Sequence, residues 1–381
     1  MANTIKLKRG TSTPTTSDIS NGEVAIDTSA KKLYVNDSGT VKEIGGGSGG
    51  GASALNDLSD AKTDNSDAAI GIGSGALAAD DSGNITVAIG KDALNDQTSG
   101  NFNCAVGVES FSKITSSAQN TAFGIYAGRY NTGSSNVALG YKAMAGSDGS
   151  SAGNYHVIIG EKAGEDITSA NYCTFVGYRA GKDITDGTNN TFIGAFAGST
   201  TNSGTYYNTF IGYQAGTNNG NGNQNVFVGA DAGLNNAAWD NVFVGNYSGD
   251  ANTSGTQNVF IGKYSGTNTT SGSHNSCLGQ ESGNDITTGS SNTCIGHKAG
   301  NTGTNDLTEG SNNILIGHDA AASSATVSNE ITLGDSNITK FRIPGIDVIL
   351  KDNGGTPTQG HVLTVDGSGE ASFEAASGGG S

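Results

Sequence analysis

The stretch Asn208-Thr209-Phe210-Ile211-Gly212-Tyr213-Gln214-Ala215-Gly216 contains a pattern that recurs from about Ala69 to Lys340. Ten of the fifteen intervals between its successive central glycines are 17 residues. These anchor glycines are Gly73, Gly90, Gly107, Gly124, Gly140, Gly160, Gly177, Gly194, Gly212, Gly229, Gly245, Gly262, Gly279, Gly296, Gly317 and Gly334. Units this short cannot each bury an apolar face, so they must stack on their neighbours. The period predicts an all-β fold, a parallel β-solenoid with coils of about 17 residues.

The residues before each anchor glycine alternate in character with the period of a β-strand. The position directly before it is aliphatic in every repeat but one, where Phe123 stands, and β-branched residues are frequent two positions earlier. These two columns share a strand face, and we expect them to fill the interior of each coil. The position between them carries six consecutive phenylalanines: Phe175, Phe192, Phe210, Phe227, Phe243 and Phe260.

Both faces of the predicted strand therefore carry apolar residues. The coil itself buries one face, and the simplest cover for the second is another copy of the same chain. We expect an elongated parallel homotrimer with the phenylalanine column near the three-fold axis. The reverse assignment also stays open, with the phenylalanines inside the coil and the aliphatic column at the interface.

Two further positions of the repeat have predictable roles. Asparagine stands four residues before the anchor glycine in eleven of sixteen repeats, which predicts amide ladders between rungs about 4.8 Å apart. Ala or Ser follows three residues after the glycine in fifteen repeats, often with a second glycine behind it, which is typical of a tight corner with positive φ. The anchor glycines of the phenylalanine repeats are expected at turns: Gly177, Gly194, Gly212, Gly229, Gly245 and Gly262.

Composition excludes several classes of partner. The 381 residues carry a net charge of −16, so a trimer would carry −48 (3 × −16), and binding to nucleic-acid backbones is not expected. No run of about 18 apolar residues occurs, so we expect no membrane insertion. The segment 1–9 does not have the pattern of a secretory signal.

Residues 1–44 form a separate unit, with strands predicted at Thr4–Lys8, Val24–Asp27, Lys32–Asn36 and Val41–Ile44. Their sequence includes Ile5-Lys6-Leu7-Lys8-Arg9-Gly10-Thr11, Gly22-Glu23-Val24-Ala25-Ile26-Asp27-Thr28 and Lys32-Leu33-Tyr34-Val35. This pattern resembles the N-terminal module of bacteriophage tail fibres of the marine and cyanophage type. In that family the module lies at the virion-proximal end, so the resemblance implies that residues 1–44 attach to a phage tail or adaptor protein.

The rest of the chain divides by composition. We predict a Gly/Ser linker at 45–52, a lead-in or cap at 53–68, a shaft of about sixteen repeats at 69–340, a β-hairpin cap or tip at 341–376 and a Gly-rich tail at 377–381. The repeat Val87-Ala88-Ile89-Gly90 is similar to the β-roll heads of trimeric autotransporter adhesins, although their period is about 14 residues. The run from Gly360 to Phe373 looks like a hairpin frequent near the C-terminal ends of phage fibre proteins.

These resemblances imply a structural tail fibre of the virion, folded in the host cytoplasm, that binds a polysaccharide or protein receptor on the host surface. A bacterial trimeric surface adhesin and, with less support, a polysaccharide depolymerase tailspike are the alternatives. We expect no catalytic, cofactor or metal site. A depolymerase would need neighbouring carboxylates, for which Glu165, Asp166 and Asp183 are the nearest candidates.

Histidine, cysteine and aromatic residues of the repeats are weaker candidates for functional sites, and the receptor contacts stay unknown. His297 and His318 occupy the same position in adjacent coils, but no His-x-His motif occurs. Cys277 and Cys294 also stack, and we expect simple packing of small side chains in a reducing compartment rather than a disulfide. The aromatic residues that are candidates for sugar contact are Tyr141, Tyr178, Tyr206, Tyr207, Tyr213 and Trp239, and the alternative for them is packing at the corners of the coil.

Overall fold

The computed structural model describes residues 8–21, 23–43, 61–63, 69–80, 85–147, 151–201, 204–340, 361–365 and 371–375. These residues form strands and turns, and none of them lies in a helix. The described part of the chain consequently contains no helix that could cross a lipid bilayer. The predicted Gly/Ser linker at 45–52 and the Gly-rich tail at 377–381 lie outside the described residues.

The N-terminal unit is a four-stranded sheet in the order β1-β2-β3-β4. Strands β2 (Val24–Asp27), β3 (Lys32–Asp37) and β4 (Thr40–Glu43) pair antiparallel, close to the predicted ranges. The first strand differs from the prediction: β1 (Lys8–Gly10) begins where the predicted strand ends, and it pairs parallel with β2. The rest of the predicted first strand lies outside the described residues.

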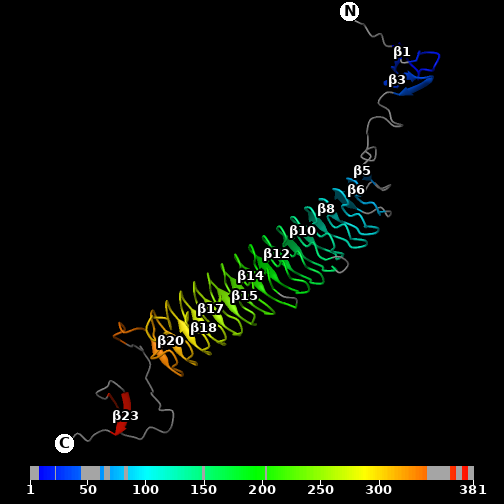
Figure 1. Cartoon of the computed structure of the whole chain (residues 1–381). Coiled ribbons are helices and arrows are strands. Elements are labelled where there is room, and N and C mark those ends of the chain that lie inside the picture. The colour runs from blue at the N-terminus through cyan, green and yellow to red at the C-terminus, as the bar shows by residue number, and fades with distance from the viewer. Residues whose placement is uncertain are drawn as a thin grey trace, which may run out of the picture. The chain divides into compact units, whose positions relative to one another are not determined.

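The repeats form a parallel β-solenoid in which each strand precedes one anchor glycine and pairs in register with the next (Figure 1). Strand β5, in the predicted lead-in, pairs antiparallel with β6. The strands are β5 (Ala61–Thr63), β6 (Ala69–Ile72), β7 (Thr86–Ile89), β8 (Cys104–Val106), β9 (Thr121–Phe123), β10 (Val137–Leu139), β11 (Val157–Ile159), β12 (Thr174–Val176), β13 (Thr191–Ile193), β14 (Thr209–Ile211), β15 (Val226–Val228), β16 (Val242–Val244), β17 (Val259–Ile261), β18 (Ser276–Leu278), β19 (Thr293–Ile295), β20 (Ile314–Ile316) and β21 (Ile331–Leu333).

The phenylalanine column lies inside the coil, so the face assignment predicted from the sequence is wrong. All six rings are 0% exposed, and neighbouring rings stack with centroids 4.7–4.9 Å apart and interplanar angles of 4–9°. The aliphatic column faces outward instead, and Ile211 is 38% exposed. In a three-residue strand whose middle side chain points inward, the two flanking side chains point outward. Flat phenylalanine rings can stack on one another at the spacing between successive rungs, so they suit the inward position. The phenylalanines therefore do not lie at an axis between chains.

Two glycines in each of the six phenylalanine repeats make this packing possible, as Gly212 and Gly216 show. Gly212 has a φ of +141°, and a Cβ there would meet the carbonyl oxygen of Gly229 in the next coil. Gly216 has a φ of +58°, and a Cβ there would lie 2.5 Å from the ring of Phe210. The predicted turn at the anchor glycine and the tight corner after it are both confirmed.

The predicted asparagine ladder is also confirmed, and it is fully buried. The Oδ1 atom of Asn208 accepts the backbone N–H of Asn225 in the next coil at 3.0 Å, and its Nδ2 donates to the carbonyl of Gly222 at 3.0 Å. Each amide thereby satisfies backbone groups that the short strands leave unpaired. The interior is held by polar ladders as well as by apolar packing.

A second polar ladder was not predicted. Asn219, Asn236 and Asn252, each seven residues after an anchor glycine, are fully buried, and their amides bond from coil to coil. In other coils the same position holds Ile167, Ile184 or Ile286. This variation between polar and apolar residues hides the column in the sequence.

The chain divides into two compact units, residues 1–335 and residues 336–381, and the second of these contains one described hairpin. Strands β22 (His361–Val365) and β23 (Ala371–Ala375) pair antiparallel over five residues each. The hairpin falls within the predicted range 341–376. Residues 341–360, also in that range, lie outside the described part.

Candidate functional site

The most extensive surface feature is an apolar stripe on the outward face of the solenoid strands. It consists of the residues one and three positions before each anchor glycine, and we call it the aliphatic stripe. No charged residue occupies any of these positions. Six of the positions three residues before the glycine hold Thr or Ser. The exposed large apolar members are Ile70, Ile89, Phe123, Leu139, Val137, Val157, Ile193, Ile211, Val226, Val259, Ile261, Leu278, Ile295, Ile314, Ile316, Ile331 and Leu333.

The aliphatic stripe is continuous, because strands β6 to β21 pair in register and bring equivalent residues to neighbouring rungs. Each member is covered above and below by its equivalents, which leaves its outer side uncovered. At roughly 100 Å² for a whole aliphatic side chain, the exposed apolar area is on the order of 1,000 Å². The largest apolar patch on a typical soluble monomer is about 300–600 Å². A surface of this size is typical of a protein–protein interface.

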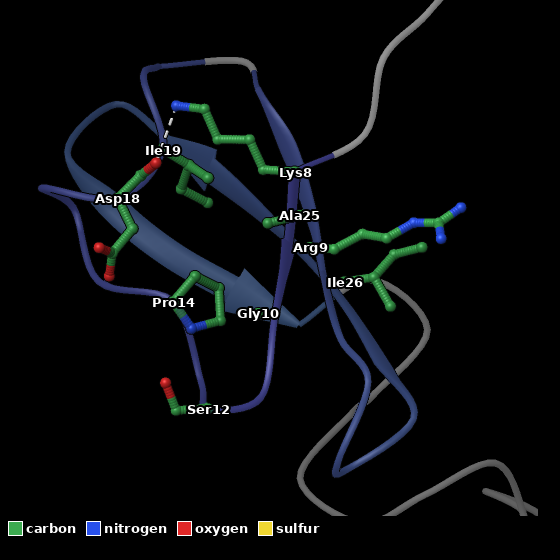
Figure 2. Close-up of a pocket in the computed structure, with 9 residues that line it drawn as sticks. All are labelled: Lys8, Arg9, Gly10, Ser12, Pro14, Asp18, Ile19, Ala25 and Ile26. Carbon is green, nitrogen blue, oxygen red and sulfur yellow. Dashed lines mark hydrogen bonds between the residues drawn. The ribbon is translucent and has the colours of Figure 1, made fainter.

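The N-terminal sheet contains a pocket of about 320 Å³ beside β1 (Figure 2). The ammonium of Lys8 donates to the carbonyl of Asp18 at 2.8 Å and lies 2.7 Å from the Glu23 carboxylate. Hydrogen bonds from Thr15 hold the pKa of Asp18 below its ordinary value, and the Lys8 bond does the same for Glu23. The lining residues are Lys8, Arg9, Gly10, Ser12, Pro14, Asp18, Ile19, Ala25 and Ile26. The acids on this face are already engaged within the sheet.

The carboxylates considered for glycoside hydrolysis do come close together, but lysines neutralise them. Glu165 lies 3.0 Å from the ammonium of Lys142, whereas Asp166 and Asp183 lie 3.5 and 2.5 Å from that of Lys182. Burial raises the pKa of Asp166 above its ordinary value, and Lys182 opposes the shift. The arrangement is an ion-pair network rather than an open pair of carboxylates with room for a sugar.

A second group of acids, Asp231 and Asp250, has raised pKa values without a lysine partner. Burial raises the pKa of Asp250 to about 6 and also raises that of Asp231. Tyr247 donates a hydrogen bond to Asp231, which lowers the pKa of that carboxyl, and the pKa of Tyr247 is raised chiefly by Asp231. The two acids stand at different positions of adjacent repeats, so no shared position marks them in the sequence.

All of the proposed sugar-contacting aromatics are exposed at the surface, including Tyr207 and Trp239. Some also pack on neighbours: the ring of Tyr178 meets Phe196 edge-on, with centroids 5.1 Å apart. Tyr155 and Tyr172, which the sequence analysis did not name, stack in parallel at 5.0 Å while both stay more than half exposed. Both stand five residues before an anchor glycine, and this shared position is the signal that could have identified them.

The cysteines carry no disulfide. Cys277 and Cys294 pair in register and are buried as free thiols, as predicted for simple packing. The hydrogen bond with Cys294, followed by burial, raises the pKa of Cys277 well above its ordinary value. A thiol of this kind is a poor nucleophile.

No family model, curated protein or solved structure matches the chain. The class of protein is therefore defined by the fold itself, a parallel β-solenoid built from about 17-residue repeats.

Proposed function

We propose that this chain is the subunit of a homotrimeric phage tail fibre, in which the aliphatic stripes of three parallel copies pack around a common axis. The observation that supports the proposal most is the stripe itself, which continues from β6 to β21 without a charged residue. An identical stripe on a second and third copy has the same rung spacing, so contacts made at one rung repeat at the next.

The size of the stripe is sufficient to hold such an assembly together. Burying on the order of 1,000 Å² per chain stabilises by roughly 25 kcal/mol at 25 cal/mol per Å². Association costs about 4–15 kcal/mol in lost rigid-body freedom, with further losses from ordering side chains. A gain of this order supports the assembly, and a solvent-exposed stripe of the same length would favour aggregation.

The proposed roles of the two ends rest on resemblance. Residues 1–44 attach the fibre to a phage tail or adaptor protein, and the other end of the chain approaches a host polysaccharide or protein receptor. Several fibres on one particle, each with three chains, add weak contacts into strong adsorption through avidity. The proposed location is the virion, after folding in the host cytoplasm.

The mass of the purified chain in solution tests the assembly. Light scattering should give three times 38.1 kDa for the native chain. Replacing Ile211 and Val226 of the stripe by lysine should lower the mass toward that of one chain, whereas lysine at the exposed Tyr207 should leave it unchanged. A monomeric native chain would overturn the assembly.

Three further measurements test the phage assignment separately from the trimer. Antibodies against the chain should label purified virions, whereas labelling of bacterial outer membranes would favour the adhesin alternative. Release of reducing sugar ends from host polysaccharide would favour the depolymerase alternative. Deleting residues 341–381 should reduce adsorption of the particles, and unchanged adsorption would contradict a receptor-binding role for that end.

A further inference from the structure

Two histidines and an aspartate lie together near the end of the solenoid. His297 and His318 each follow an anchor glycine, and the strands before them, β19 and β20, pair in register. Their imidazole rings stack with centroids 5.1 Å apart and planes inclined by 20°. Asp319 donates its backbone N–H to the carbonyl of His297 at 3.0 Å, which ties the two coils together at this point.

The donor atoms of the three side chains are close enough to share one ion. Asp319 Oδ2 lies 3.1 Å from His318 Nδ1, and one donor atom from each residue lies within 4.8 Å of the other two. A tetrahedral Zn²⁺ ion, about 2.0–2.1 Å from each donor, needs donors about 3.4 Å apart. Rotation of these partly exposed side chains can close the remaining gap of roughly 1 Å without backbone movement.

A second observation also indicates a missing partner. The other carboxylate oxygen of this cluster, Asp319 Oδ1, is inaccessible to solvent and has no hydrogen-bond partner among the described residues. Buried polar atoms are nearly always paired, and an orphan at a functional site commonly marks an ion or water. A cation held by the two imidazoles and the carboxylate would give this group its missing electrostatic partner.

The charges around the cluster permit a cation. Lys298, which follows His297 in the chain, is paired with Glu281, with 3.6 Å between its ammonium and the carboxylate. The local ion pair is therefore neutral, and Asp319 adds one negative charge to a chain that is already acidic.

We propose that His297, His318 and Asp319 form a binding site for a borderline transition-metal ion such as Zn²⁺, with a fourth position open to water. Two imidazole nitrogens and one carboxylate oxygen form a donor set that suits Zn²⁺, and Cu²⁺ or Ni²⁺ as well. The bound ion links two successive coils and stabilises the terminal rungs, where fraying of a solenoid begins. Twenty-one residues separate the two histidines, so no short motif marks the site in the sequence.

Titration of the full chain with ZnCl₂ by calorimetry at pH 7.5 tests the site. We expect one ion per chain, and a dissociation constant at least 10-fold weaker in His297→Gln and in His318→Gln, since loss of even an indirect partner of a metal costs 10–100-fold. Asp319→Asn should weaken binding in the same direction. The matched control His274→Gln removes an exposed histidine outside the cluster and should leave the constant unchanged.

A spectroscopic measurement keeps the test valid if a variant fails to fold. With Cu²⁺ as the probe, the electron paramagnetic resonance spectrum of the unmodified chain should show coupling to two imidazole nitrogens. Three outcomes would each overturn the proposal. They are the absence of a stoichiometric Zn²⁺ ion at pH 7.5, coupling of Cu²⁺ to a single nitrogen, and equal Zn²⁺ affinity in the native chain and both histidine variants.

Discussion

His156 replaces an asparagine in the buried ladder, and this substitution predicts a specific sensitivity to acid. Its backbone N–H bonds to Oδ1 of Asn136 at 3.0 Å, as a ladder asparagine would. Its ring Nδ1 accepts the backbone N–H of Cys173 at 3.2 Å, and its Nε2 lies 2.9 Å from the carbonyl of Ala170. The network thus assigns the neutral tautomer with the proton on Nε2, in which the ring reproduces both bonds of an amide.

Protonation would disrupt this arrangement. A second ring proton on Nδ1 would face the N–H of Cys173, and the charge would be buried, because His156 is only 1% exposed. Burial accordingly lowers the pKa of His156 from 6.5 to about 4. Since the folded pKa lies below the unfolded one, the stabilisation is complete above pH 6.5 and is lost as the pH falls toward 4.

The magnitude follows from the displacement of the pKa. At 1.36 kcal/mol per unit, a shift from 6.5 to about 4 corresponds to about 3 kcal/mol, of which about 2 kcal/mol is lost by pH 5.0. That pH lies above the sequence pI of about 4.5, so the protein should stay soluble for the measurement. His156→Asn restores the ladder amide and should remove this share of the acid sensitivity.

Denaturant unfolding at pH 7.5 and 5.0, at one fixed protein concentration, measures the effect. The free energy of unfolding of the native chain, relative to that of His156→Asn, should fall by about 2 kcal/mol between the two pH values. Groups that titrate in both proteins cancel in this difference, and His274→Asn, at an exposed histidine, serves as the control. Equal pH dependence in the native chain and His156→Asn would refute the reasoning.

Three further substitutions test the packing and the electrostatics of the solenoid, each by denaturant unfolding. Gly212→Ala should cost about 3 kcal/mol, because Gly212 has a positive φ and a Cβ there would meet the next coil. The control Gly303→Ala should cost less, because a Cβ at Gly303 meets nothing within 4 Å. Equal losses in the two variants would contradict the stacking argument. Phe210→Ala should cost about 3–5 kcal/mol by opening a cavity between two stacked rings, and a loss below about 1 kcal/mol would mean that the ring is not buried. Asp250→Asn should stabilise by about 1 kcal/mol at pH 7.5 and by less at pH 5.0. A carboxyl group with a raised pKa lowers the free energy of unfolding as the pH rises from about 4 to about 6, and solvent screening keeps the effect of this half-buried group small. A larger stabilisation at pH 5.0 than at pH 7.5 would contradict the raised pKa of Asp250.

Much of this architecture was predictable from periodicity alone. The interval between anchor glycines identified the solenoid, the alternation before each glycine located the strands, and the recurrent asparagine predicted a ladder that Asn208 and Asn225 do form. These inferences succeed because they depend on local backbone requirements. A positive φ needs glycine, a strand alternates its side chains, and equivalent residues meet when coils of one period stack.

Other features depended on the tertiary structure. Alternation places Phe210 and Ile211 on opposite faces of a strand, but it does not say which face turns inward, because both residues are apolar. The closure of the coil decides this: the ring fits against Gly216 and between its neighbours, and the aliphatic side chain is left outside. The environment of His156 and the cluster around His318 likewise depend on contacts between coils. Such contacts join residues about one period or more apart, and only the register of the folded chain brings them together.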